Sequence, residues 1–362
     1  MKRLLLSLLF CSWCFSGVYA ADDSSVLTLF AGTSEAEKTD TASADEKESS
    51  IFSFLNFKKP KKEAAKLNVA DEKRLSPLEQ TIKLADKGDV NAQLLLGYSY
   101  LYGENGAKVD YDKSFEYYAK AAMQNDSIGL NNLGSLYYSG IGIGRNTAKA
   151  AILFEKAANL GNPEAAVNLG FILISGNGVK KNPDLAMDYF EKAAKEKNPT
   201  AEFMLGYAYY TGKLRPQDYH TAAPLIRDAA AAGFDEAQYV VAQMYVNGQG
   251  FPQNYGNAVK NLKLAVSQGS VEAMTALGNI LARGEKYTKD VYVAHVMFNL
   301  AAVRGAAGAA ERRNLLEEKM KIDEILQAQS EAERYSPKPS ELSNYIRQTF
   351  GNNVRYYIED AK

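Results

Sequence analysis

The sequence has very few of the residues that disulfides, metal sites and most acid–base catalysis require. Its 362 residues include two cysteines, one tryptophan and two histidines. Both cysteines and the tryptophan lie in the first 20 residues, MKRLLLSLLFCSWCFSGVYA. A chain cleaved after Ala20 would therefore have no thiol. This excludes disulfides and thiolate-bound metals, so its stability must come from packing alone.

Residues 1–20 have the composition of a secretory signal peptide. A basic start precedes an apolar run from Leu4 to about Phe15, and small residues lead up to Ala20. The competing interpretation is a retained membrane anchor, but the run is shorter than the roughly 20 apolar residues that span a bilayer. We predict cleavage after Ala20 and export, with the bacterial periplasm as the favoured location and secretion as the alternative.

An excess of positive charge is also missing. Removal of Lys2 and Arg3 with the signal peptide leaves 42 − 2 = 40 basic against 43 acidic residues, a net charge of −3. A weakly acidic chain lacks the basic surface by which proteins bind phosphate backbones. We therefore expect no nucleic-acid partner.

Residues 21–74 have no sustained hydrophobic period and are dominated by small and charged residues, which predicts a disordered leader. Within it, the apolar stretch 51–57 runs into Lys58, Lys59, Lys61 and Lys62. Such a stretch could contact an anionic membrane or a partner at residues 51–62. The alternative, a plain linker, is favoured because seven residues bury little area.

No catalytic or cofactor-binding motif occurs in the sequence context that its function would require. The glycines between Gly140 and Gly144 resemble a phosphate-binding loop, but they join two predicted helices instead of following a strand. His220 and His295 have no neighbouring Cys or His at ligand spacing. We predict no enzyme activity, no cofactor and no metal, and keep an envelope enzyme or cell-wall ligand binder as a minor alternative.

The sequence instead contains a repeat. Glycines end the same half of six successive units at spacings of 37 and then 36 residues: Gly103, Gly140, Gly176, Gly212, Gly248 and Gly284. Self-similarity at this period indicates a stacked array of supersecondary units. We predict an all-α solenoid over residues 75–335, followed by a C-terminal tail over residues 336–362.

Each unit is predicted to hold two helices, as residues 162–197 show. Asn162 can cap the first helix, Pro163 suits its first turn, and Gly176 ends it. The second helix begins after a cap that is Asp or Asn in all six units: Asp110, Asn146, Asn182, Asp218, Asn254 and Asp290. Apolar residues at helical spacing mark one buried stripe on each helix.

Several positions depart from the pattern or end it. Ala242 replaces the mid-helix glycine of the fifth unit, and Pro224 in the fourth predicts a late start or a kink of that helix. Ser76 opens a starting half-unit, and the charged stretch after Ala309 is typical of a terminal cap. A further short helix is expected at residues 340–350.

The repeat pattern consists of the motif LGxxYxxG, followed by an Asp or Asn cap, a small residue, an aromatic residue and KAA. This order of motifs resembles the Sel-1-like repeats, which are related to tetratricopeptide repeats. The clearest segments are 96–103, 133–140 and 205–212. This resemblance implies a right-handed αα-superhelix and a protein interaction scaffold. In exported bacterial members it further implies roles in envelope assembly, polysaccharide export, signalling or host-cell entry. Cysteine-rich members described as β-lactam-hydrolysing rely on disulfides that this chain cannot form.

The side of the first helices opposite the apolar stripe that recurs from unit to unit is not simply polar, and by analogy with tetratricopeptide repeats it would line a concave groove. Aromatic and amide side chains there could bind a protein or peptide partner. The alternative is packing between units, and both remain open. The candidate groove residues are Tyr98, Asn131, Ser135, Tyr138, Phe171, Phe203, Tyr207, Tyr210, Tyr239, Gln243 and Asn279.

We therefore interpret the chain as a non-enzymatic scaffold or adaptor of the bacterial cell envelope that binds a protein partner through this face. A secreted factor that engages host proteins during entry is the alternative interpretation.

Overall fold

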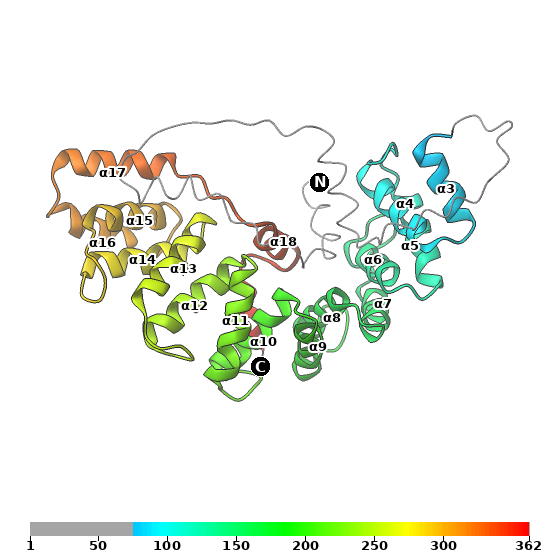
Figure 1. Cartoon of the computed structure of the whole chain (residues 1–362), viewed down its shortest axis with the longest axis horizontal. Coiled ribbons are helices and arrows are strands. Elements are labelled where there is room, and N and C mark those ends of the chain that lie inside the picture. The colour runs from blue at the N-terminus through cyan, green and yellow to red at the C-terminus, as the bar shows by residue number, and fades with distance from the viewer. Residues whose placement is uncertain (1–74, 362) are drawn as a thin grey trace, which may run out of the picture. The chain divides into compact units, whose positions relative to one another are not determined.

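A computed structural model describes residues 75–361 and shows seventeen α-helices, with no strand among these residues. The helices form the predicted all-α solenoid of paired helices, coloured in chain order in Figure 1. Two compact units divide them, residues 75–198 and residues 199–360. The predicted signal peptide, the leader and the stretch 51–62 lie outside the described residues.

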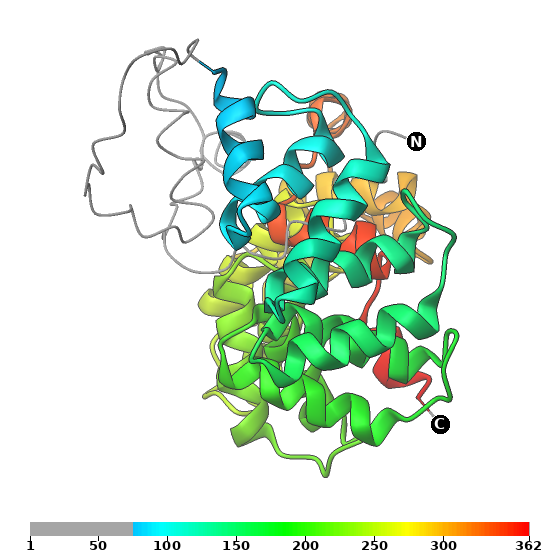
Figure 2. The same ribbon diagram turned by 90° about the vertical axis from the view of Figure 1, so that its right-hand side faces the viewer.

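The first unit holds the starting helix and three helix pairs, stacked one pair on the next in Figure 2. Each helix contacts the one that follows it within the unit. The helices are α3 (Pro77–Asp86), α4 (Val90–Tyr102), α5 (Tyr111–Met123), α6 (Ser127–Ser139), α7 (Thr147–Asn159), α8 (Pro163–Ser175) and α9 (Pro183–Lys195).

The second unit holds three further pairs, two terminal helices and two short helices near the C-terminus. The pairs are α10 (Pro199–Thr211) with α11 (Tyr219–Ala231), α12 (Asp235–Asn247) with α13 (Tyr255–Ser267), and α14 (Val271–Arg283) with α15 (Val291–Val303). They are followed by α16 (Ala309–Glu317), α17 (Ile322–Arg334), α18 (Glu341–Phe350) and α19 (Arg355–Glu359).

The predicted caps of the second helices are confirmed in all six repeats. In each, the side chain of the Asp or Asn accepts a hydrogen bond from a backbone N–H in the first turn of its helix. The first helices follow the same rule at Asp89, Asp126, Asn162 and Ser270. The starting helix α3 also begins as predicted, with Ser76 and Glu79 forming a reciprocal capping box.

The glycines that end the first helices adopt the left-handed backbone conformation that favours glycine. Their φ angles lie between 67° at Gly284 and 76° at Gly140. After the second helices, a glycine adopts the same left-handed conformation in some repeats, whereas Asn125 and Lys197 adopt it in others. The ends of the helices in each repeat are thus determined by the backbone conformation of single residues.

A second glycine, present in five of the six first helices, allows the two helices of a pair to approach closely. A Cβ atom added at Gly170 would lie 2.8 Å from Cε1 and Cζ of the Phe190 ring. Gly97, Gly134 and Gly278 face aromatic rings in the same way. The ring therefore packs directly on the backbone of the neighbouring helix.

The expectation of a late start at Pro224 is wrong. Helix α11 begins at Tyr219 after its Asp218 cap and continues through Pro224 to the same length of 13 residues as its counterparts. Pro224 is exposed, so the carbonyl that loses its helical N–H partner lies where water is accessible.

The charged stretch after Ala309 forms two helices, α16 and α17, both packed on α15. The helix expected at residues 340–350 is present as α18. Within residues 75–361, the helices are too short or too polar for any of them to cross a bilayer.

Candidate functional site

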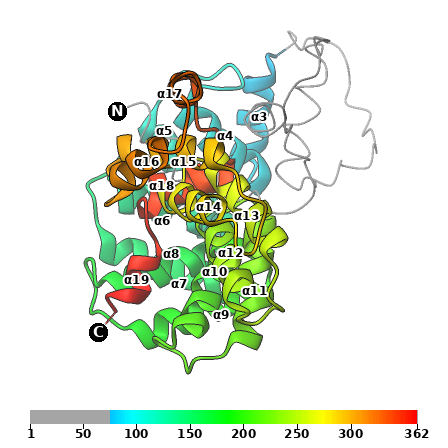
Figure 3. The ribbon, with the colours of Figure 1, turned by 90° about the vertical axis from the view of Figure 1, so that its left-hand side faces the viewer.

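Residues 336–360, which we call the C-terminal segment, fold back onto the second unit. Two prolines keep residues 336–339 out of a helix. The backbone N–H of Lys338 donates to the carbonyl of Ser267 at the end of α13 (2.8 Å). Helices α18 and α19 then lie on one side of the helix pairs of this unit (Figure 3), with α18 at the beginning of α12 and α19 beside α10.

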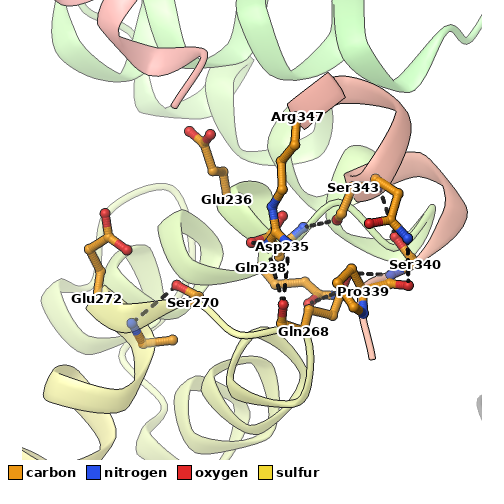
Figure 4. A network of polar contacts seen from close by, with 12 residues as sticks. Asp235, Glu236, Gln238, Gln268, Ser270, Glu272, Pro339, Ser340, Ser343 and Arg347 are labelled. Carbon is orange, nitrogen blue, oxygen red and sulfur yellow. Dashed lines mark hydrogen bonds and ion pairs between the residues drawn. The ribbon is translucent and has the colours of Figure 1, made fainter. Parts of the chain in front are cut away.

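The segment docks on a buried joint between two repeats (Figure 4). The side-chain amide of Gln268 donates to the carbonyl of Gly233 and to Oε1 of Gln238, both at 2.9 Å. Gln238 in turn donates to the carbonyl of Ala230 (3.3 Å). These bonds tie the end of α13 to the turn that precedes α12.

The first unit builds the same joint from repeat residues alone. There Gln124 donates to the carbonyl of Gly88 (3.0 Å) and to Oε1 of Gln93 (2.9 Å), and Gln93 donates to the carbonyl of Ala85 (3.1 Å). The joint is therefore a product of repeat packing and does not need the C-terminal segment.

Helix α18 begins on this joint. Ser340 caps α18, its hydroxyl donates to the carbonyl of Gly233 (2.8 Å), and its backbone N–H donates to Oε1 of Gln268 (2.9 Å). One turn later the hydroxyl oxygen of Ser343 accepts a hydrogen bond from the backbone N–H of Asp235 (3.1 Å).

The bond from Asp235 to Ser343 supplies what α12 lacks. The N-cap residue of α12 is Phe234, which offers no side-chain acceptor, whereas α4, α6, α8 and α14 are capped by their own residues. Free N–H groups at a helix start need an acceptor. The C-terminal segment provides one from more than 100 residues away.

Two arginines of the segment meet three carboxylates of the repeats. Arg347 pairs with Asp235. Arg355 donates from Nε to Glu236 (2.9 Å) and from Nη2 to Glu272 (3.2 Å), which begin two different helices. The Arg355 guanidinium also lies 5.4 Å from the ring centroid of Tyr239, within the range of a cation–π contact.

Helix α19 is fixed at both ends. Glu236 accepts from the backbone N–H of Val354 at its start (3.0 Å), and Glu359 near its end accepts from the hydroxyl of Tyr207. Ile346 and Ile358 of the segment have no exposed surface. The segment is thus held by apolar contacts as well as by charge.

Burial changes the acidity of the groups beneath the segment. It raises the pKa of Glu236 to about 7, although Arg355 and the N–H of Val354 oppose the rise. It also raises the pKa of Tyr207, to which the hydrogen bond with Glu359 adds. The pKa of Tyr239 rises through burial as well, against the effect of Arg355.

The structure brings two of the predicted groove residues, Tyr207 and Tyr239, against the C-terminal segment. Tyr210 instead packs on Tyr219 and donates to Gln249 (3.2 Å). Phe203 is fully buried, with its ring 4.8 Å from that of Phe234 between centroids. Phe203 therefore lies in the interior of the second unit.

Gln243 and Asn279 line an open cavity of about 270 Å³ between α12, α13 and α14, together with Val246, Ile280 and Arg283. The Gln243 amide donates to the hydroxyl of Tyr239 (2.7 Å). Tyr239 thus links this cavity to the surface that the C-terminal segment covers.

In the first unit the predicted residues divide between surface and interior. Tyr98 and Tyr138 are half-buried, and Arg145 lies 5.4 Å from the ring centroid of Tyr138. Asn131, Ser135 and Phe171 are buried. Their burial assigns them to packing between helices, and partner binding by Tyr98 and Tyr138 stays a prediction.

Sequence reasoning missed the carboxylates of α12 and their arginine partners. One signal was available, because the fifth repeat is the only one whose first helix begins with two acidic residues, Asp235 and Glu236. Nothing in the sequence pairs them with Arg347 and Arg355, which lie more than 100 residues downstream.

The two histidines have structural surroundings. His220 is exposed in the first turn of α11, and its backbone N–H bonds Asp218 (2.9 Å). His295 is fully buried, and its Nε2 lies 2.9 Å from Glu317. Residues 75–361 contain no cluster of three His, Cys, Asp or Glu side chains able to hold a metal ion.

The helix pairs coincide with six matches to the Sel1 repeat, at residues 90–126, 127–162, 163–198, 199–234, 235–270 and 271–305. No curated protein sequence matches the chain.

Two solved structures resemble the chain. One is a protective antigen of uropathogenic Escherichia coli strains that displays an SLR fold. It has 25% identity and a TM-score of 0.53, and the match covers 75% of this chain and 66% of the antigen. The other is a Sel1 repeat protein from Oxalobacter formigenes, with 27% identity and a TM-score of 0.53, covering 63% of this chain and 99% of that one.

Proposed function

Because the chain belongs to the Sel1 repeat family, whose members are in general protein–protein interaction scaffolds, we propose that it is a non-enzymatic scaffold of the bacterial cell envelope. It binds a protein partner through the first helices of its repeats. One observation carries this proposal: those helices already hold a peptide segment, residues 336–360, by side-chain bonds to backbone groups and by ion pairs.

The binding face extends beyond the part that the segment covers. Gln243 and Asn279 place amide groups in the open cavity beside Tyr239. Amides can bond both the N–H and the carbonyl of an extended or helical backbone. Tyrosines such as Tyr98 and Tyr138 offer large, rigid contact surfaces at a low cost in conformational entropy.

The scaffold acts after export, and residues 1–20 are its cleaved signal peptide. The periplasm is the proposed compartment. Release into the medium, where a host protein would be the partner, is the alternative outcome of the following experiment.

Cross-linking in intact cells tests the proposal. Cells that express the native chain, the double variant Gln243→Ala with Asn279→Ala, or the control Ile152→Ala are cross-linked and separated into periplasm and medium. Ile152 is an exposed residue on α7, a second helix. We expect a cross-linked protein adduct in the periplasm that the double variant reduces at least about tenfold, the effect of removing two hydrogen bonds.

The control should leave the adduct unchanged. An adduct that forms equally with all three proteins would show that this face does not bind the partner, and an adduct confined to the medium would favour the secreted factor.

A further inference from the structure

We propose that the surface formed by Asp235, Glu236 and Glu272 binds an arginine-bearing helical segment of a partner protein, and that the chain's own C-terminal segment occupies it until such a partner displaces it. This inference rests on the proposed function, because it names the class of partner and the way in which access to the scaffold is controlled.

The residues that form the surface all belong to the repeats. The joint at Gln268 is matched by the joint at Gln124, which forms from repeat residues alone. Asp235, Glu236 and Glu272 lie in the first turns of α12 and α14, where the helix dipole favours negative charge. The repeats therefore supply all three carboxylates, and the segment adds only the cap at the start of α12.

The C-terminal segment fits the surface incompletely. It engages Oδ2 of Asp235, whereas Oδ1 is buried and has no hydrogen-bond partner. Buried polar atoms without a partner are costly, and a carboxylate can accept two parallel bonds from one guanidinium. A partner that satisfies both oxygens would bind more tightly than the resident segment, which makes displacement feasible.

The contacts define what the partner must present. One is an acceptor such as the hydroxyl of Ser343 for the uncapped start of α12, followed one helical turn later by an arginine in the place of Arg347. A second arginine must reach Glu236 and Glu272 together and cover the ring of Tyr239. A planar guanidinium with several donors meets this requirement, and a lysine ammonium does not.

The covalent link favours the resident segment. The segment follows α17 after the single residue Tyr335, so its effective concentration at the surface is in the millimolar range typical of short linkers. A weak competitor is therefore excluded, and a partner of high complementarity is selected.

A peptide binding assay with the full-length mature chain tests the inference. The probe is a fluorescent peptide of residues 336–361, and its binding is followed by anisotropy. In the variant Arg347→Glu with Arg355→Glu the resident segment is repelled from the carboxylates. We expect the peptide to bind this variant at least about tenfold more tightly than the native chain, whose surface is occupied.

Two controls define the chemistry. A peptide with both arginines replaced by lysine should bind the variant at least about tenfold more weakly, because the shared contact with two carboxylates is lost. Adding Asp235→Asn and Glu236→Gln to the variant should abolish binding of the native peptide.

Equal binding to the native chain and to a variant with native helicity would overturn the inference and make the segment a fixed part of the fold. If the double variant does not fold, Arg355→Gln alone should still raise peptide affinity several-fold, and no change there overturns it equally. The assay uses no natural partner, so its result is independent of the cross-linking in cells.

Discussion

At the residue scale, the repeats combine invariant positions with a few side chains that set one repeat apart. The Asp or Asn caps of the second helices and the glycines that end the first helices recur in every pair, whereas Asp235 and Glu236 occur together in the fifth repeat only. Glu236 is the most constrained of these residues, because it contacts Arg355 and caps the start of α19 while being nearly buried.

Glu236 should make the stability of the protein depend on pH. Its pKa is raised from 4.5 to about 7 in the folded chain, mainly by burial. A raised pKa contributes stability that is full below the unfolded value of 4.5 and is lost as the pH rises through 7. We expect the free energy of unfolding, relative to Glu236→Gln, to fall by up to about 3 kcal/mol between pH 4.5 and pH 8.

Denaturant titrations of the native chain and of Glu236→Gln at several pH values measure this difference. Parallel stability curves for the two proteins across that range would contradict the assigned pKa.

At the scale of elements, the close pairing of helices depends on the second glycine of the first helix, which faces an aromatic ring in four of the six repeats. In the fourth repeat Gly206 faces Ile226 instead. The fifth repeat departs at both positions, with Ala242 in place of the glycine and Leu262, from the same buried cluster, in place of the ring. The two departures compensate each other, since a methyl group on the first helix is matched by a narrower side chain on the second.

Gly170→Ala should therefore destabilise the protein by about 1–2 kcal/mol. Overpacking against Phe190 lowers the free energy of unfolding by about 1–3 kcal/mol, and the better helix propensity of alanine offsets up to about 1 kcal/mol of this loss. The ring cannot easily move, because it is fully buried and packs edge-on against Phe171 at 5.3 Å between centroids. Thermal or denaturant unfolding provides the measurement.

The double variant Gly170→Ala with Phe190→Leu reproduces the fifth-repeat combination in the third repeat. It should be more stable than the sum of the two single changes predicts, by about 1 kcal/mol. Strict additivity would show that the glycine and the ring are not coupled.

At the scale of the whole molecule, each helix of a unit mainly contacts its neighbours in the chain, and the C-terminal segment is the clearest exception. In such arrays stability is approximately a sum of terms within repeats and between neighbours. A destabilising substitution in one repeat should therefore affect mainly that repeat and its neighbours.

Hydrogen exchange can test this locality. We expect Gly170→Ala to increase amide exchange in α8 and α9 and to leave α14 and α15 unchanged. Arg347→Glu with Arg355→Glu should increase exchange at the start of α12, where the N–H of Asp235 loses Ser343. A uniform increase over residues 75–361 in either variant would indicate one cooperative unit instead.

The sequence alone determined the repeat, the beginnings of its helices and the glycines that end them, because caps and left-handed turns involve residues three to six apart. It also placed α18, whose cap Ser340 and preceding prolines are local signals. It could not tell which groove candidates are buried, since Phe203 and Tyr207 are buried by contacts with other elements, whereas Tyr210 is only half-buried. Nor could it show that the C-terminal segment covers part of the predicted binding face. Only the tertiary structure decided these points, because burial and the ion pairs of Arg347 and Arg355 depend on residues far apart in the sequence that meet only after the helices have packed.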